Sequence, residues 1–177
     1  AGVAPVVDLG PDTTVCATFL LDAQNSGSSY LWNTSESTQA ITVTTTGDYW
    51  VVVTDTNSCV GTDTVSVTIN PLPIVVLSGL DTICAGDNTL LTGSSGGTSQ
   101  WYFNGVAISG ATSSTYLASQ AGVYNMIKTN ANGCADSSAV GIELVVNNLP
   151  VVTLTGNDTI CSGDSTLLTG SSGGTSQ

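Results

Sequence analysis

The sequence predicts an all-β protein made of tandem antiparallel β-sandwiches, with about seven strands in each sandwich. Runs such as QAITVTTTGDYWVVVTD are rich in Thr and Val and alternate apolar with polar residues, which is the pattern of strands with one buried face. Clusters of Gly, Asn and Ser interrupt these runs at roughly 8–12 residue spacing, as in a sandwich of short strands. No helical periodicity with caps competes with this pattern, because β-branched residues dominate.

An internal repeat sets the domain organisation. Asp81–Gln100 and Asp158–Gln177 agree at 18 of 20 positions, at an offset of 77 residues. In each unit a proline opens an apolar run and a cysteine follows eleven residues later, and a more divergent copy of this pattern stands at the front of the chain. We therefore expect sandwich 1 (residues 1–71), sandwich 2 (72–148) and the incomplete N-terminal third of a further unit (149–177).

The first unit shows the strand pattern six times, near residues 4–9, 17–22, 28–33, 40–44, 48–54 and 61–69. Trp32 and Trp101 follow the first cysteine of their units by 16 and 17 residues, which suits a core indole on the third strand. Tyr49 and Tyr124 each follow a glycine by two residues, the place of a tyrosine corner whose hydroxyl bonds back to the chain. These four aromatic residues are the predicted core.

The cysteines predict a disulfide framework. Domains of this size bury only part of their surface, so a covalent cross-link would stabilise them. We expect one bridge in each whole unit, Cys16–Cys59 and Cys84–Cys134, which requires an oxidising compartment. Because the second cysteine lies ten residues after the core tyrosine, about 30 Å along a strand, each bridge should clamp one pole of its sandwich. Cys161 would then pair beyond the end of the chain. Zinc is the alternative, but the sequence has no CxxC and no His.

Composition excludes several classes of function. Thirteen acids stand against one basic residue, Lys128, and the net charge is −12. Nucleic acid and anionic membranes are excluded as partners, because both are bound through Lys and Arg. No apolar run reaches the roughly 18 residues of a membrane helix. No signal peptide is visible, so we expect a mature or internal start. Without His the usual nucleophilic triads cannot be built, and we expect no catalytic residue and no enzyme activity.

The order of motifs resembles a known family. YLWNTSESTQAITVTTTGDYWVVVTDTNSCVGTDTVSVTINPLP and the later QWYFNGVAISGATSSTYLASQAGVYNMIKTNANGC resemble the Ig-like or PKD-like repeats of very large cell-surface proteins of Bacteroidota. Such repeats occur in gliding-motility adhesins and other surface proteins exported by the type IX system. The resemblance covers the whole chain. It implies Ig-like sandwiches, an extracellular location at the cell surface and a role as stalk.

The same resemblance implies a modification, because Bacteroidota attach O-glycans at Asp-Ser/Thr followed by a small or aliphatic residue. Five positions fit this pattern: Thr13, Thr64, Thr82, Thr159 and Ser165. Asp-Thr is also ordinary turn chemistry, so a structural reading of the same residues stays open.

Calcium is the one cofactor that the residues suggest, and the signal is weak. Asp8, Asp12, Asp55 and Asp63 fall near the expected domain junctions, where several carboxylate oxygens could converge on the ion. No loop signature of the EF-hand kind accompanies them.

The linkers favour a mechanical function. INPLP and VNNLP contain proline and no flexible Gly-Ser run, and proline stiffens a chain. We expect a structural stalk that extends a distal adhesive region, with neighbouring repeats, and identical chains in a filament, as partners. The main alternative is a carbohydrate-binding array in which outward-facing Trp50 and Tyr102 stack on surface glycans. An accessory region of an enzyme is a third. We expect the last unit to be cut from a longer rod or completed by strands of another chain.

Overall fold

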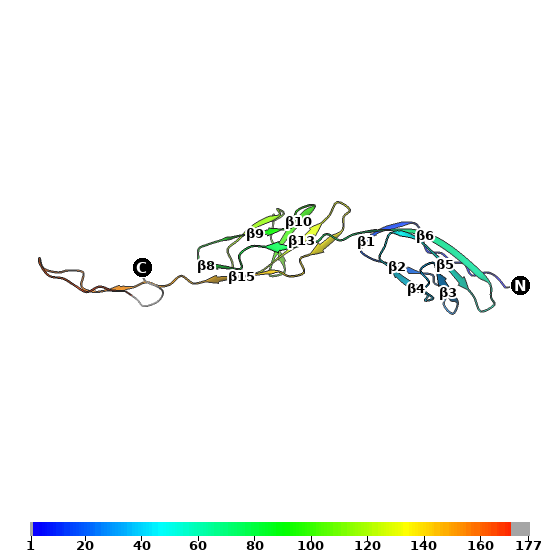
Figure 1. Cartoon of the computed structure of the whole chain (residues 1–177), viewed down its shortest axis with the longest axis horizontal. Coiled ribbons are helices and arrows are strands. Elements are labelled where there is room, and N and C mark those ends of the chain that lie inside the picture. The colour runs from blue at the N-terminus through cyan, green and yellow to red at the C-terminus, as the bar shows by residue number, and fades with distance from the viewer. Residues whose placement is uncertain (1, 171–177) are drawn as a thin grey trace.

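The computed structural model of the protein describes residues 2–170. Figure 1 shows two β-sandwiches placed end to end along one long axis, with the N-terminus at one end and the third unit toward the other. Strands are the only regular elements within residues 2–170, which confirms the predicted all-β class of tandem sandwiches.

Sandwich 1 is built from six strands in two sheets. They are β1 (Thr13–Cys16), β2 (Phe19–Asp22), β3 (Ser29–Trp32), β4 (Ala40–Val43), β5 (Gly47–Thr54) and β6 (Val60–Asn70). The larger sheet has the order β1-β6-β5-β3, and β2 pairs with β4 in the smaller one. The last five strands lie within two residues of their predicted positions, because their alternating residues do face the core and the solvent in turn.

Sandwich 2 repeats this plan with additional short strands. Its elements are β7 (Leu77–Ser78), β8 (Thr82–Cys84), β9 (Thr89–Gly93), β10 (Thr98–Phe103), β11 (Val106–Ala107), β12 (Thr115–Ala118), β13 (Gly122–Thr129), β14 (Ala135–Ser137) and β15 (Ile142–Asn147). One sheet has the order β11-β10-β13-β15-β8, with β14 also pairing with β13, and the other has the order β12-β9-β7.

The predicted first strand, residues 4–9, is wrong. This segment is extended and alternately exposed and half-buried, and Val7 and Leu9 pack against the core of sandwich 1. It does not join a ladder. The carbonyl of Pro5 lies 2.2 Å from the place where a Cβ on Gly61 would stand, and the Leu9 N–H donates to Asp63 Oδ2 at 2.7 Å. The alternation of exposure is thus present, but two features keep the segment out of a ladder. Pro5 has no N–H to donate, and the Leu9 N–H is bonded to the Asp63 side chain and not to a backbone carbonyl.

In each sandwich the strand that carries the first cysteine, β1 or β8, pairs parallel with the last strand. Cys16 lies opposite Asn70 in the β1–β6 pair, and Cys84 lies opposite Asn147 in the β8–β15 pair. The prediction of purely antiparallel sheets is wrong at this one pair in each sandwich. A parallel pair needs a long crossover connection, and the rest of the sandwich supplies it. The first cysteine therefore sits at the end of the sandwich where the chain leaves for the next one.

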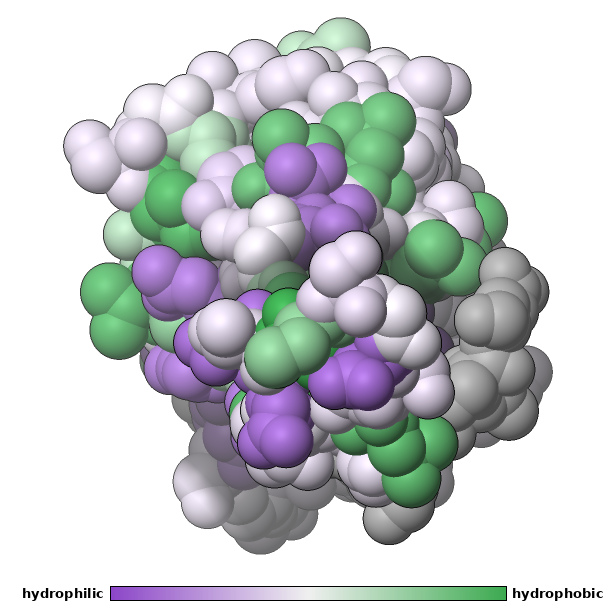
Figure 2. Space-filling model, turned by 90° about the vertical axis from the view of Figure 1, so that its left-hand side faces the viewer, coloured by the Kyte–Doolittle hydropathy of each residue, from purple (hydrophilic) through white to green (hydrophobic). Residues whose placement is uncertain are grey.

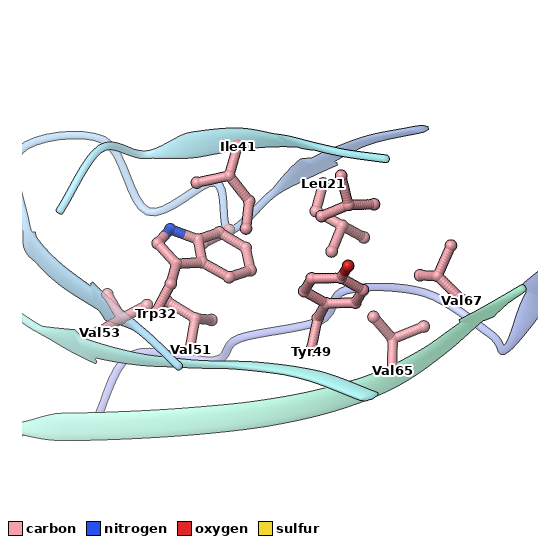
Figure 3. Close-up of a cluster of buried hydrophobic side chains, with 10 residues drawn as sticks. Leu21, Trp32, Ile41, Tyr49, Val51, Val53, Val65 and Val67 are labelled. Carbon is pink, nitrogen blue, oxygen red and sulfur yellow. The ribbon is translucent and has the colours of Figure 1, made fainter. Parts of the chain in front are cut away.

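The core of sandwich 1 confirms two predicted aromatic residues. Figure 3 shows the Trp32 indole and the Tyr49 ring between the two sheets, with Leu21 and Ile41 reaching them from the smaller sheet. Trp32 is 1% exposed, and its Nε1–H donates to the Thr38 carbonyl at 2.8 Å. The Tyr49 hydroxyl donates to the Thr45 carbonyl at 2.7 Å, which is the predicted tyrosine corner.

The core of sandwich 2 is built around the equivalent Trp and Tyr residues. Trp101 is fully buried and donates through Nε1–H to the Ser113 carbonyl at 3.0 Å. The buried Tyr124 donates through its hydroxyl to the Gln120 carbonyl at 3.0 Å. Burial raises the pKa of the Tyr124 phenol, and this hydrogen bond opposes that shift only in part.

The single basic residue is part of this second sandwich and not of its surface. Lys128 is 3% exposed, and its Nζ donates to the Ser94 carbonyl at 2.6 Å and to Ser99 Oγ at 3.4 Å. The described surface of the protein therefore presents acids without a lysine or arginine among them.

The third unit begins the same fold. Its two short strands, β16 (Leu154–Thr155) and β17 (Thr169–Gly170), pair in the register of β7 and β9, with Leu154 opposite Gly170 as Leu77 is opposite Gly93. Figure 2 looks at this end of the molecule and shows hydrophobic side chains exposed among polar ones. The side chains that would enter a core are uncovered: Leu168 is 60% exposed, against 0% for its counterpart Leu91.

Candidate functional site: the junction between the two sandwiches

Two structures from different sandwiches meet at the junction. The first is the end of β1 in sandwich 1. Cys16 closes this strand beside Asn70, the last residue of β6, and the Ala17 N–H donates to the Asn70 carbonyl at 3.0 Å. This ladder fixes Cys16 at the point where the chain passes into the linker.

The second structure is the turn between β13 and β14 in sandwich 2. Asn130 holds it, because its Oδ1 accepts the N–H groups of Asn132 and Cys134, each at 3.0 Å. The Asn130 N–H donates to the Cys134 carbonyl at 2.9 Å. An Asn that bonds its own backbone in this way is a common turn device, and here it presents the Cys134 side chain toward sandwich 1.

A disulfide joins these two structures. Cys16 and Cys134 are bonded, with their Cα atoms 5.6 Å apart and a sequence separation of 118. The predicted pairs Cys16–Cys59 and Cys84–Cys134 are therefore wrong. Cys59 precedes the 11-residue strand β6 while Cys16 lies beside its last residue. At about 3.3 Å per residue the two cysteines are roughly 35 Å apart, far beyond the reach of a disulfide.

The linker is held against the same turn. The Asn130 Nδ2 donates to the Pro71 carbonyl at 2.9 Å, and Cys134 Sγ lies 4.0 Å from the Asn70 carbonyl oxygen. Cys134 is itself buried, at 1% exposure. Pro71 and Pro73 restrict the backbone on both sides of Leu72. A covalent bond, a hydrogen bond and two prolines thus restrict the angle between the sandwiches.

The four acids proposed for calcium are occupied by backbone donors. Asp63 accepts from Leu9, and Asp12 accepts from the Ser66 N–H at 2.9 Å. Asp8 accepts from Gly10 at 2.9 Å, and Asp55 accepts from Cys59 at 2.8 Å. Among residues 2–170, no three Asp, Glu, Cys or His side chains lie close enough to hold a metal ion. These carboxylates close turns and edges of sandwich 1.

We therefore expect EDTA to leave the thermal unfolding of the protein unchanged, with a shift in Tm of less than about 1 °C. A bound ion would stabilise the fold by mass action, so its removal would lower Tm. Differential scanning calorimetry with 5 equivalents of CaCl₂ and then with excess EDTA measures the difference. A fall of several degrees in EDTA that CaCl₂ reverses would show a calcium site and contradict this expectation.

The two aromatic residues considered for sugar binding are not brought together. Trp50 lies in β5 of sandwich 1 and is 41% exposed, and Tyr102 lies in β10 of sandwich 2 and is half-buried. Tyr102 is paired across the ladder with Asn125. The Asn33 N–H donates to the Trp50 carbonyl, and the Trp50 N–H donates to Asn33 Oδ1. Each sandwich thus offers one aromatic side chain on an outer face, and the two do not form one platform.

Among residues 2–170, a shifted pKa is found for Tyr124 in the core of sandwich 2 and for Asp22 at the surface of sandwich 1. The pKa of Asp22 is lowered by a hydrogen bond from the Gln39 side chain and another from the Gln24 N–H, which is a turn contact at the surface.

Four of the five candidate O-glycan positions, Thr64, Thr82, Thr159 and Ser165, are exposed, and Thr13 is half-buried. No helix of the part described is long and apolar enough to cross a membrane.

Comparison with known proteins finds similarity in solved structures only. No family model matches the chain, and no curated protein matches it. Murine CEACAM1b is 19% identical, with 75% of this chain and 95% of that chain covered and a TM-score of 0.38. The four N-terminal Ig domains of a Dscam1 isoform are 16% identical, with 82% and 46% covered and a TM-score of 0.33.

Three Ig domains of titin, I67–I69, are 14% identical, with 96% of this chain and 77% of that chain covered and a TM-score of 0.37. The chain therefore spans about half of the Dscam1 fragment and most of the titin and CEACAM1b ones. With TM-scores below 0.5, these similarities add nothing to the fold beyond the strands and registers described above.

Proposed function

We propose that the protein is a spacer segment of an extracellular, surface-attached adhesin or filament. The observation that carries this proposal is the junction disulfide, Cys16–Cys134, which ties consecutive sandwiches to one another at their ends. The bond lies outside both core clusters, and it restricts bending of one sandwich against the next. That restriction is useful to a rod and has no evident use in a binding domain or an enzyme.

Resistance to proteases supports the same role. The one residue that trypsin-like enzymes recognise, Lys128, is buried in the central strand β13, so the folded chain offers them no site. The net charge of −12 keeps neighbouring rods apart in solution. Both properties suit a protein outside the cell, where the disulfide is also stable. Export by the type IX route and O-glycans at the exposed Asp-Ser/Thr positions belong to this proposal.

Small-angle X-ray scattering tests the rod. Each sandwich adds roughly 35–45 Å, the length of its longer strands and loops, so the oxidised protein should give one narrow, elongated distance distribution. Cys16→Ser should broaden that distribution, because the linker then becomes the sole covalent connection. Cys161→Ser is the matched control and should leave the curve unchanged. Equal curves for the oxidised protein and the Cys16→Ser variant would contradict a stiffening role for the junction.

The alternative, a carbohydrate-binding array, is favoured by one observation, the exposed Trp50 ring. A glycan array probed with the protein and with Trp50→Ala separates the two functions. A spacer gives no specific binding in either case. Specific binding that falls at least tenfold in Trp50→Ala would favour the array and contradict the spacer as the main function.

A further inference from the structure

Sandwich 2 reproduces the setting of Cys16 at Cys84. Cys84 lies opposite Asn147 in a parallel ladder, as Cys16 lies opposite Asn70. The next residue closes the ladder in both cases: the Ala85 N–H donates to the Asn147 carbonyl at 2.8 Å, and the Ala17 N–H to that of Asn70 at 3.0 Å. Both cysteines are exposed at the end of the sandwich from which the chain leaves. Cys84 is a free thiol in the structure.

Sandwich 1 likewise reproduces the setting of Cys134 at Cys59. Asp55 takes the place of Asn130, and its Oδ1 accepts the N–H groups of Asn57 and Cys59, each at 2.8 Å. The Asp55 N–H donates to the Cys59 carbonyl at 3.0 Å, as the Asn130 N–H donates to the Cys134 carbonyl in the other turn. Cys59 is the second free thiol, and it is half-buried.

The chain that enters sandwich 1 also lies against Cys59 as the linker lies against Cys134. Gly2 stands three residues before Pro5, and Asn70 stands three residues before Pro73. A Cβ on Gly2 would come within 2.6 Å of Cys59 Sγ, and the Asn70 carbonyl oxygen lies 4.0 Å from Cys134 Sγ. The entrance of sandwich 1 therefore carries Cys59 in the setting that Cys134 has at the junction. The exit of sandwich 2 carries Cys84 in the setting that Cys16 has there.

We propose that each repeat is disulfide-bonded to both of its neighbours. Cys59 forms a disulfide with the first cysteine of a preceding repeat, and Cys84 forms one with the second cysteine of a following repeat. Cys59 and Cys84 do not pair with each other, because they stand at opposite ends of the two-sandwich unit. Each bond forms by thiol–disulfide exchange: two thiols of the protein and one low-molecular-weight disulfide give the protein disulfide and two small thiols, so electrons and protons balance.

Staggered bonds of this kind make closed loops that overlap. The loop from Cys16 to Cys134 already contains Cys84, where the next loop starts, so every peptide bond between the first and last bridge lies inside at least one loop. One cut by a protease, or one broken peptide bond, would then leave the rod in one piece. Bridges within single sandwiches would leave each linker outside any loop. This inference rests on the proposed function in one respect, that the chain is a stretch of a longer array of repeats.

Two extended chains test the pairing. In the first, residues 101–148 follow Gln177, which completes the third unit with the chain's own sequence because Gln177 corresponds to Gln100. In the second, residues 72–146 precede Gly2, which keeps the spacing to Pro5. Each chain is refolded in oxidised and reduced glutathione, blocked with N-ethylmaleimide and mapped by mass spectrometry without reduction.

In the first chain we expect Cys84 to bond to the copy of Cys134 and to lose at least nine-tenths of its maleimide labelling. In the second we expect the same of Cys59, bonded to the copy of Cys84. Cys84→Ser in the first chain should leave the copy of Cys134 labelled, and Cys161→Ser should change nothing. If one extended chain fails to fold, the other tests the same rule at the other end.

Free Cys84 or Cys59 in a folded extended chain would overturn the inference, and so would a bond between the copy of Cys134 and Cys161. Such a failure is distinct from failure of the spacer function. The scattering of the 177-residue protein depends on Cys16–Cys134 alone and would still show whether the junction stiffens the rod.

Discussion

Pulled by its two ends, the oxidised protein should lengthen by about 400 Å less than the reduced protein. The junction disulfide carries the force from Cys16 directly to Cys134, and the 118 residues of separation between them never come under load. A fully extended chain spans about 3.3–3.6 Å per residue, which gives the withheld length. Both cores lie largely inside this protected stretch, so most of their residues cannot be extended while the bridge is intact.

Single-molecule force spectroscopy measures the withheld length, with handles at the two ends and Cys59, Cys84 and Cys161 replaced by Ser. Cys16→Ser in this background should restore the full extension and reveal two unfolding events. Restoring Cys84 should change nothing. Full extension of the oxidised chain, or a withheld length that depends on Cys84, would show that the bridge is not between Cys16 and Cys134.

Trp101→Ala should destabilise sandwich 2 by about 3–5 kcal/mol, the usual cost of removing a buried Trp. The indole is fully buried, packs on Tyr116 with ring centroids 6.0 Å apart and satisfies the Ser113 carbonyl. A small domain has only about 5–15 kcal/mol of stability in all, so the variant should leave sandwich 2 partly unfolded at 37 °C. Sandwich 1 should keep its stability, because its core is a separate cluster.

Hydrogen exchange resolved by peptide follows each sandwich separately in urea. Trp101→Ala should speed exchange in β10 and β13 and leave β5 and β6 protected, and Trp32→Ala should do the reverse. Trp50→Ala is the matched control, because the same side chain is removed from an exposed place and should cost less than about 1 kcal/mol. Equal loss of protection in both sandwiches after either core substitution would contradict two independent cores.

The sequence was sufficient for the last five strands of sandwich 1 and for the aromatic core residues of both sandwiches, since these depend on local periodicity. β5, with its alternation of buried Tyr49, Val51 and Val53 and outward neighbours, is predicted almost to the residue. The tyrosine corner followed from a glycine two residues earlier, and the core indole from its distance to the first cysteine. All of these signals lie within one element or its immediate neighbours.

The pairing partner of the first strand could not be read in this way. Residues 4–9 alternate as a strand does, and only the course of the backbone past Gly61 keeps them out of a ladder. Thr13–Cys16 has a weaker pattern, yet it pairs along the whole end of β6. Whether a short segment pairs parallel with the edge strand of a sheet depends on long-range topology, and hydrophobic periodicity carries no information about that.

The cysteine pairing was missed for a related reason. In a tandem repeat each cysteine has an equivalent in every unit, so spacing alone cannot tell a bond within one repeat from a bond to the next. The deciding fact is the end of the sandwich at which each cysteine stands. The parallel β1–β6 pair places Cys16 at the exit, and the turn before β6 places Cys59 at the entrance. The strand between them was predicted near residues 61–69, but its direction relative to β1 was not.

Cleavage at Lys128 tests the junction disulfide most directly, because this is the one site for trypsin in the chain. The Cys161→Ser protein is blocked with N-ethylmaleimide, unfolded in urea to expose Lys128, cut, and run on a gel without reductant. We expect fragments 1–128 and 129–177 to stay joined, to separate in Cys16→Ser and to stay joined in Cys84→Ser. Separation in Cys84→Ser with a joined Cys16→Ser would contradict a bond between consecutive sandwiches.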